Sequence, residues 1–160
     1  MRASGCVDAC PACPHRDFSA QMSLEQKERW LRSELAPWAP AIQPITGPSQ
    51  RWGYRRKSLL HARLEGGVWR FGMVKMHGRL EEFIPIPDCP LHHESVNDLF
   101  FLASRLAPAS LPLAFGLVSG SSLTLVVKET RNPTWVAEFS SWKWPSASSL
   151  FVNWNPVAGK

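Results

Sequence analysis

No stretch of the sequence is apolar over the roughly 18 residues that a membrane-spanning helix needs. The N-terminus also lacks the apolar segment of about 7–15 residues that follows the basic start of a secretory signal. We therefore expect a cytoplasmic protein with no membrane partner. In that reducing compartment, clustered thiols indicate metal or redox chemistry before structural disulfides.

The sequence also lacks repeats, heptads, low-complexity tracts and a G-x-G-x-x-G loop that would cradle a nucleotide. Its 160 residues and hydrophobic content of 44% are sufficient for a packed core in one domain or two small ones. These absences exclude solenoids, coiled coils and a dinucleotide-binding domain. A compact globular fold is what the composition predicts.

The pattern of apolar and turn-forming residues predicts an α+β fold. We expect a helix capped by Ser23 and ended by Pro37 and Pro40, and a second helix over 96–106 capped by Ser95. Alternating runs predict strands at 57–64, 68–75, 80–86, 122–129, 134–140 and 149–154. We divide the chain into a cysteine loop, helix and proline-rich connector (1–50), a basic antiparallel sheet (51–94), and a small helix-plus-strands unit (95–160).

Positive charge is concentrated in the predicted sheet. The net charge is +5, and 8 of the 18 Lys and Arg residues lie between Arg51 and Arg79, where Glu65 is the one acid. Trp52, Tyr54 and other aromatic residues alternate with these cations. Adjacent cations can span phosphates and aromatic rings can stack on the unpaired bases of single-stranded or looped RNA, so this segment is a candidate nucleic-acid surface. The alternative is a solvated basic face over a sheet whose aromatic residues belong to the core.

Three of the four cysteines fall within eight residues, as C-x3-C-x2-C at Cys6, Cys10 and Cys13, and the fourth is the remote Cys89. Four thiolates satisfy either a tetrahedral zinc site or an iron–sulfur cluster. A close trio with one distant thiol is more typical of a [4Fe–4S] cluster, whereas zinc sites commonly pair two short knuckles. Zinc, unligated thiols and disulfides remain alternatives.

The order of these motifs resembles the N-terminal part of the SAM-dependent RNA uridine-C5 methyltransferases, which make 5-methyluridine in 23S ribosomal RNA or transfer RNA. The resemblance is carried by the cysteine trio, the helix SLEQKERWLRSEL, Tyr54-Arg55-Arg56-Lys57, the strand FGMVKMHGR, Asp88-Cys89-Pro90-Leu91 and the closing VNWNP. Arg56 departs from the family, which usually has Asn at this position. The start of the chain at the cysteine loop is similar to the short members that lack an OB-like (TRAM) barrel.

The resemblance implies an RNA-binding, [4Fe–4S]-bearing portion of such an enzyme, with 23S ribosomal RNA favoured over transfer RNA. The family's chemistry needs a Rossmann-like domain with a SAM loop, a nucleophilic cysteine and a carboxylate base, and none of these is recognisable in the sequence. We expect the chain to be a fragment that binds RNA without methylating it, with SAM bound only by the full-length enzyme. A stand-alone zinc-binding nucleic-acid module is the alternative.

Two sets of residues follow as site predictions. The metal ligands are Cys6, Cys10, Cys13 and Cys89, and the RNA-binding residues are Tyr54, Arg55, Arg56, Lys57, Arg63 and Arg70. For Trp69 and Phe71 we favour a place in the core over base stacking, because they alternate with Arg70. The whole interpretation requires that Cys89 return in space to the cysteine trio.

Overall fold

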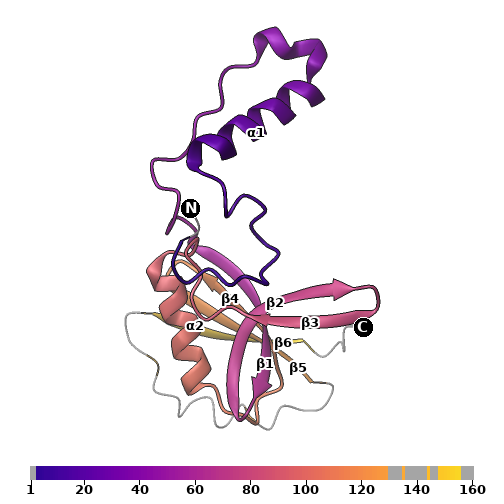
Figure 1. The fold of residues 1–160 in the computed structure, drawn as a ribbon. Helices are drawn as coiled ribbons and strands as arrows, with labels where there is room; N and C mark the ends of the chain where they lie inside the picture. The colour runs from indigo at the N-terminus through magenta and orange to yellow at the C-terminus, as the bar shows by residue number, and fades with distance from the viewer. Residues whose placement is uncertain (1–2, 130–134, 136–143, 145–147, 156–160) are drawn as a thin grey trace.

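The computed structural model describes residues 3–129, 135, 144 and 148–155 and confirms the α+β class (Figure 1). Within these residues the helices are α1 (Ala20–Glu34), the 3-10 helix η1 (Ala36–Ala41) and α2 (Glu94–Leu106). The strands are β1 (Lys57–Glu65), β2 (Val68–His77), β3 (Leu80–Pro85), β4 (Leu113–Ser119), β5 (Ser122–Lys128) and β6 (Ser149–Asn155).

A six-stranded sheet in the order β3-β2-β1-β4-β5-β6 organises the fold. All neighbouring strands are antiparallel except β5 and β6, which are parallel. β1 is the seam of the sheet, because it pairs with β2 along one edge and with β4 along the other. The strands of 51–94 and those of 95–160 therefore form one continuous sheet.

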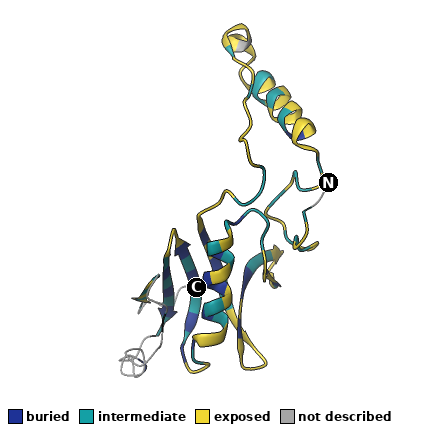
Figure 2. Ribbon diagram, turned by 90° about the vertical axis from the view of Figure 1, so that its left-hand side faces the viewer, coloured by how far each residue is buried: buried dark blue, intermediate teal, exposed yellow. Residues whose placement is uncertain are grey.

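Helix α2 covers one face of this sheet and closes the core (Figure 2). Its buried side chains recur at the 3.6-residue period: Val96, Leu99, Phe100 and Ala103. Below them lie the inward-facing residues of the strands, Leu60, Trp69, Phe71, Val118, Leu123, Leu125 and Val127. The preference for Trp69 and Phe71 as core residues is confirmed, since each is 5% exposed.

Strand β4 was absent from the sequence prediction, and Gly116 explains why. Glycine weakens a strand pattern because it has no side chain to pack and is costly to order. Here a Cβ at Gly116 would lie 2.8 Å from Cε1 of Phe71 and 3.0 Å from Cε1 of Phe100. The absent side chain makes room for these two rings, which pack with centroids 5.1 Å apart.

Both predicted helix caps are wrong by a few residues. Helix α1 begins at Ala20, and its cap is Ser19, whose hydroxyl accepts a hydrogen bond from the Met22 amide at 3.1 Å. Ser23 is inside the helix and buried, with its Oγ 2.8 Å from Nδ1 of His15. Helix α2 is capped by His93, whose Nδ1 accepts from the Ser95 amide.

Of the three C-terminal tryptophans that the structure describes, two lie in or against the core and one lies at the surface. Trp135 is buried and Trp144 packs against the core, whereas Trp154 is 42% exposed. The Trp154 indole instead donates to the Glu129 carbonyl at 2.9 Å. Trp142 and the predicted strand at 134–140, apart from Trp135, lie outside the described residues.

Helices α1 and η1 stand away from the sheet as an arm, which is joined to it by the N-terminal loop before α1 and by the connector after η1 (Figure 1). Trp30 and Trp38 on this arm are each 64% exposed. Among the residues that the structure describes, neither α1 nor α2 has the length and apolar character to cross a membrane.

Adjacent leucines on β1 test the register of the seam strand. Leu60 is 3% exposed and Leu59 is 55% exposed. We expect Leu60→Ala to lower the free energy of unfolding by about 2–5 kcal/mol, because it leaves a cavity in the core. Leu59→Ala is the matched control and should change it by no more than about 0.5 kcal/mol. Urea unfolding measures both, and equal losses would contradict the register.

Candidate metal centre and nucleic-acid interface

The cysteine trio lies in a loop built from successive turns. The Cys6 amide donates to the Ala3 carbonyl, the Cys10 amide to Val7, and the Arg16 amide to Cys13, at 3.1–3.3 Å. Gly5 adopts a φ of +82°, and a Cβ there would lie 3.0 Å from a carboxylate oxygen of Asp88. The loop therefore approaches the residue beside Cys89, and only glycine suits that position without strain.

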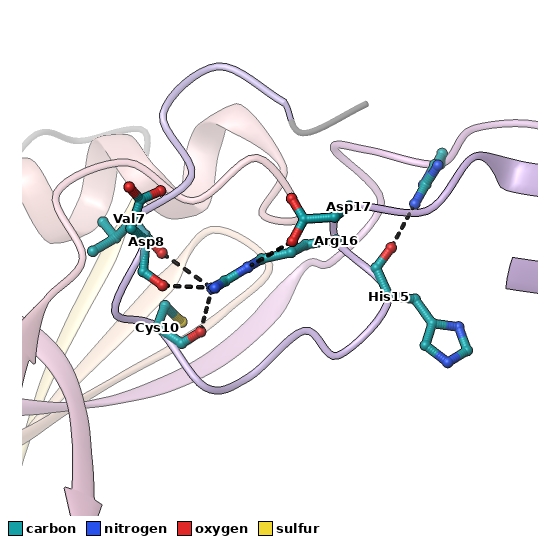
Figure 3. Close-up of polar contacts among 7 residues, drawn as sticks. Val7, Asp8, Cys10, His15, Arg16 and Asp17 are labelled. Carbon is teal, nitrogen blue, oxygen red and sulfur yellow. Dashed lines mark hydrogen bonds and ion pairs between the residues drawn. The ribbon is translucent and has the colours of Figure 1, made fainter.

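Arg16 holds the middle of this loop together. Its guanidinium donates to the Cys10 carbonyl at 2.6 Å, to Asp8 at 2.7 Å and to Val7 at 3.4 Å, and it pairs with Asp17 at 3.6 Å (Figure 3). These carbonyls belong to the turn between the first two cysteines. A charged donor that satisfies several loop carbonyls fixes the backbone from which the thiols project.

Asn97 of α2 performs the same task for the Cys89 loop. Its side-chain oxygen accepts from the Cys89 amide at 3.3 Å, and its NH₂ group donates to the Cys89 carbonyl at 3.2 Å. The same NH₂ group donates to Asp88, and the oxygen lies 2.9 Å from Nδ1 of buried His92. The sequence analysis did not identify Arg16 or Asn97, because neither belongs to a short motif with a known role.

The basic segment before β1 is tied to the Cys89 loop by its backbone. The Gly53 amide donates to the Pro90 carbonyl at 2.8 Å, the Arg55 amide to Leu91 at 2.9 Å, and the His93 amide to Arg55 at 2.9 Å. Arg55 and His92 form a short parallel bridge. Arg55 is thereby fixed beside the loop that carries the fourth cysteine.

All four cysteines line one cavity of about 220 Å³ between the N-terminal loop and the sheet. Arg55, Lys57 and His92 line it as well. Each cysteine is half-buried and none is in a disulfide, and Cys10 and Cys89 pack against the core. The structure thus places Cys89 in the same cavity as the trio.

Burial raises the pKa of the Cys13 thiol, and the neighbouring Cys89, Cys10 and Cys6 thiols raise it further. Burial also raises the pKa of Cys89, against the opposing effect of hydrogen bonds from the Leu91 and His92 amides. The mutual repulsion of thiolates around one cavity is what a bound cation would relieve. Burial lowers the pKa of His92, so this histidine is neutral at pH 7.

The four thiols around the cavity suit two kinds of metal group. A tetrahedral zinc site places all four sulfurs on one atom, whereas in a [4Fe–4S] cluster each of four cysteines binds a different iron. Among the described residues, no three His, Cys, Asp or Glu side chains lie close enough together to hold a metal ion as they stand.

The six predicted RNA-binding residues separate into two groups. Tyr54 to Lys57 are exposed just before and at the start of β1, and two of them, Arg55 and Lys57, line the cysteine cavity. Arg63 and Arg70 face each other across β1 and β2, near the far end of the hairpin. Arg63 is six positions beyond Lys57 along β1, which at about 3.3 Å per residue places them about 20 Å apart. Arg63 also lies over the Phe83 ring, 4.9 Å from its centroid.

Compared with protein-family models and with curated proteins, the chain matches none. The features that bear on its function are therefore the residues around the cysteine cavity and the order of the sequence motifs.

Removing the Arg16 side chain tests the order of the cysteine loop. We expect Arg16→Met to speed amide hydrogen exchange at Cys6 and Cys10, because the loop carbonyls lose their charged donor. Mass spectrometry of the peptide covering 3–18 measures the exchange. Arg29→Met, on the exposed side of α1, is the matched control. Unchanged exchange in Arg16→Met would show that the turns hold without the guanidinium.

Proposed function

We propose that the chain is the RNA-binding, [4Fe–4S]-bearing N-terminal portion of a SAM-dependent 23S ribosomal RNA uridine-C5 methyltransferase. Cys6, Cys10, Cys13 and Cys89 would hold the cluster, and Tyr54 to Lys57 would contact RNA. The cluster would supply a rigid inorganic cross-link between the N-terminal loop and the sheet. A C-terminal domain, on this polypeptide or on a separate one, would supply the SAM site.

The observation that best supports this proposal is the shared cavity. Thiols from opposite ends of the basic segment line it together with Arg55 and Lys57. An arrangement that positions cations beside a cluster is expected of a module that presents RNA to a catalytic domain. The order of the sequence motifs supports the same assignment.

The residues of this chain have defined tasks under the proposal. Arg55 and Lys57 neutralise phosphates, Arg16 and Asn97 hold the two ligand loops, and the core side chains exclude water from one side of the cluster. The sequence has four cysteines, so a chain that uses all of them as ligands has no thiol left to attack C6 of uracil. That nucleophile belongs to the C-terminal domain.

Metal content tests the cluster directly. Anaerobically purified protein should contain about four irons and four sulfides per chain and absorb broadly near 400 nm. Cys89→Ser should lower the iron content to about half or less and make the remaining cluster labile to air, because the loop from the sheet loses its ligand. Asn97→Ala keeps all four thiols but removes the hydrogen bonds that hold the Cys89 loop, so it separates the loss of a ligand from a displacement of the loop. One zinc per colourless chain would instead support a zinc-binding nucleic-acid module.

The salt dependence of RNA binding tests the cations. We expect the double variant Arg55→Ala with Lys57→Ala to weaken binding to a single-stranded 23S fragment uniformly across sequences. The negative slope of log K against log salt concentration should become shallower by about 1–2, because two phosphate contacts are lost.

Arg79→Ala with Arg105→Ala removes the same charge from exposed positions outside the cavity and serves as the control. A slope that changes equally in both double variants would mean that net charge alone governs binding. The pair Arg63→Ala with Arg70→Ala then determines whether the far end of the hairpin contributes.

A further inference from the structure

A second cavity, of about 670 Å³, lies on the other side of the cysteine loop. Its lining comes from the N-terminal half of α1, from residues 47–48 of the connector and from the segment 51–55 that leads into β1. Cys13 and Arg55 line both cavities, so the two are neighbours. Its volume is typical of cavities that bind small ligands.

The cavity is positively charged. Its described lining contains no Asp or Glu and four cationic side chains, Arg16, Lys27, Arg51 and Arg55. The Arg16 guanidinium is engaged by the carbonyls of the cysteine loop. Lys27, Arg51 and Arg55 are therefore the cations that an anionic ligand would meet.

Aromatic rings share this lining with the cations. Trp52, Tyr54 and His15 contribute to it, and Tyr54 is 51% exposed. The Arg51 guanidinium lies over the Trp52 ring, 4.9 Å from its centroid, and donates to the His15 carbonyl at 2.8 Å. Tyr54 stands between Gly53 and Arg55, whose amides are bonded to the Cys89 loop. The rings are thus presented from a fixed backbone.

We propose that this cavity receives one unstacked nucleotide of a single-stranded RNA. The base would stack on Trp52 or Tyr54, and the adjoining phosphate would meet Lys27 and Arg51. A nucleotide matches both the cations and the aromatic rings of the lining, through its phosphate and its base. An acidic peptide would pair with the cations only and would make no stacking contact with the rings. This inference rests on the proposed RNA function and adds Lys27, Arg51 and Trp52 to the interface.

Binding of fluorescein-labelled hexauridine, measured by anisotropy with the whole purified chain, tests the proposal. Lys27→Ala, Arg51→Ala and Trp52→Leu should each weaken binding about tenfold. Trp38→Leu removes an equally large ring from the exposed arm and should leave binding unchanged. Retention of affinity within about twofold in both Arg51→Ala and Trp52→Leu would overturn the proposal.

Competition separates the ligand chemistries. Hexauridine should be displaced by unlabelled RNA and much less by inorganic polyphosphate or hexaglutamate of the same charge. Equal displacement by either competitor would mean that the cavity recognises anions without a base, which contradicts the proposal.

Photocrosslinking of unmodified protein to hexauridine containing 4-thiouridine gives a readout independent of variant folding. Its crosslinks should map to Trp52 or Tyr54, and crosslinks confined to other peptides would overturn the proposal.

The variants also separate the two proposals. If Arg55→Ala with Lys57→Ala weakens binding and the Arg51 and Trp52 variants do not, the nucleotide cavity is wrong and the RNA function stands. If the unmodified protein fails to bind hexauridine and the 23S fragment alike, the RNA function itself is wrong.

Discussion

The backbone hydrogen bonds between residues 53–55 and 90–93 are the constraint on which the candidate site depends. They join the start of the seam strand β1 to the loop that carries Cys89. Arg55 and the fourth cysteine are consequently fixed relative to each other by main-chain geometry, independently of any side-chain contact. The metal ligation and the phosphate contact that we propose would therefore be structurally coupled, because a shift of either segment would move both.

The N-terminal loop is attached to the body by weaker means. Val7 and Cys10 pack against the core, and Gly5 lies against Asp88. The hydrogen bonds of the Arg16 guanidinium and its ion pair with Asp17 all lie within the N-terminal loop. A cluster bound by all four thiols would provide the missing strong link, and its binding energy would then become folding energy. Under this proposal, one ligand from the loop after β3 and three ligands from the N-terminal loop would tie the two segments together.

Sequence patterns predicted the local elements well wherever periodicity was strong. The hairpin of β1 and β2, the strands β3, β5 and β6, and helix α2 all lie within two residues of their predicted bounds. The failures have physical causes. Gly116 weakens the strand pattern of β4, and its missing side chain leaves room for the rings of Phe71 and Phe100. Helix α1 begins at Ala20 with Ser19 as its cap, so the predicted cap Ser23 lies inside the helix, where its hydroxyl contacts His15.

The sequence by itself determined the α+β class, the strands β1, β2 and β3, the extent of α2 and the four thiols as a candidate ligand set. Only the tertiary structure decided that β1 pairs with β4, that Arg63 and Arg70 lie far from Tyr54 to Lys57, and that Arg16 and Asn97 hold the two loops that carry the cysteines. Periodicity and turn chemistry act between neighbours along the chain, so they leave a local signal. Long-range strand pairing and loop-to-helix hydrogen bonds depend on segments that meet only after folding, and no short pattern encodes them.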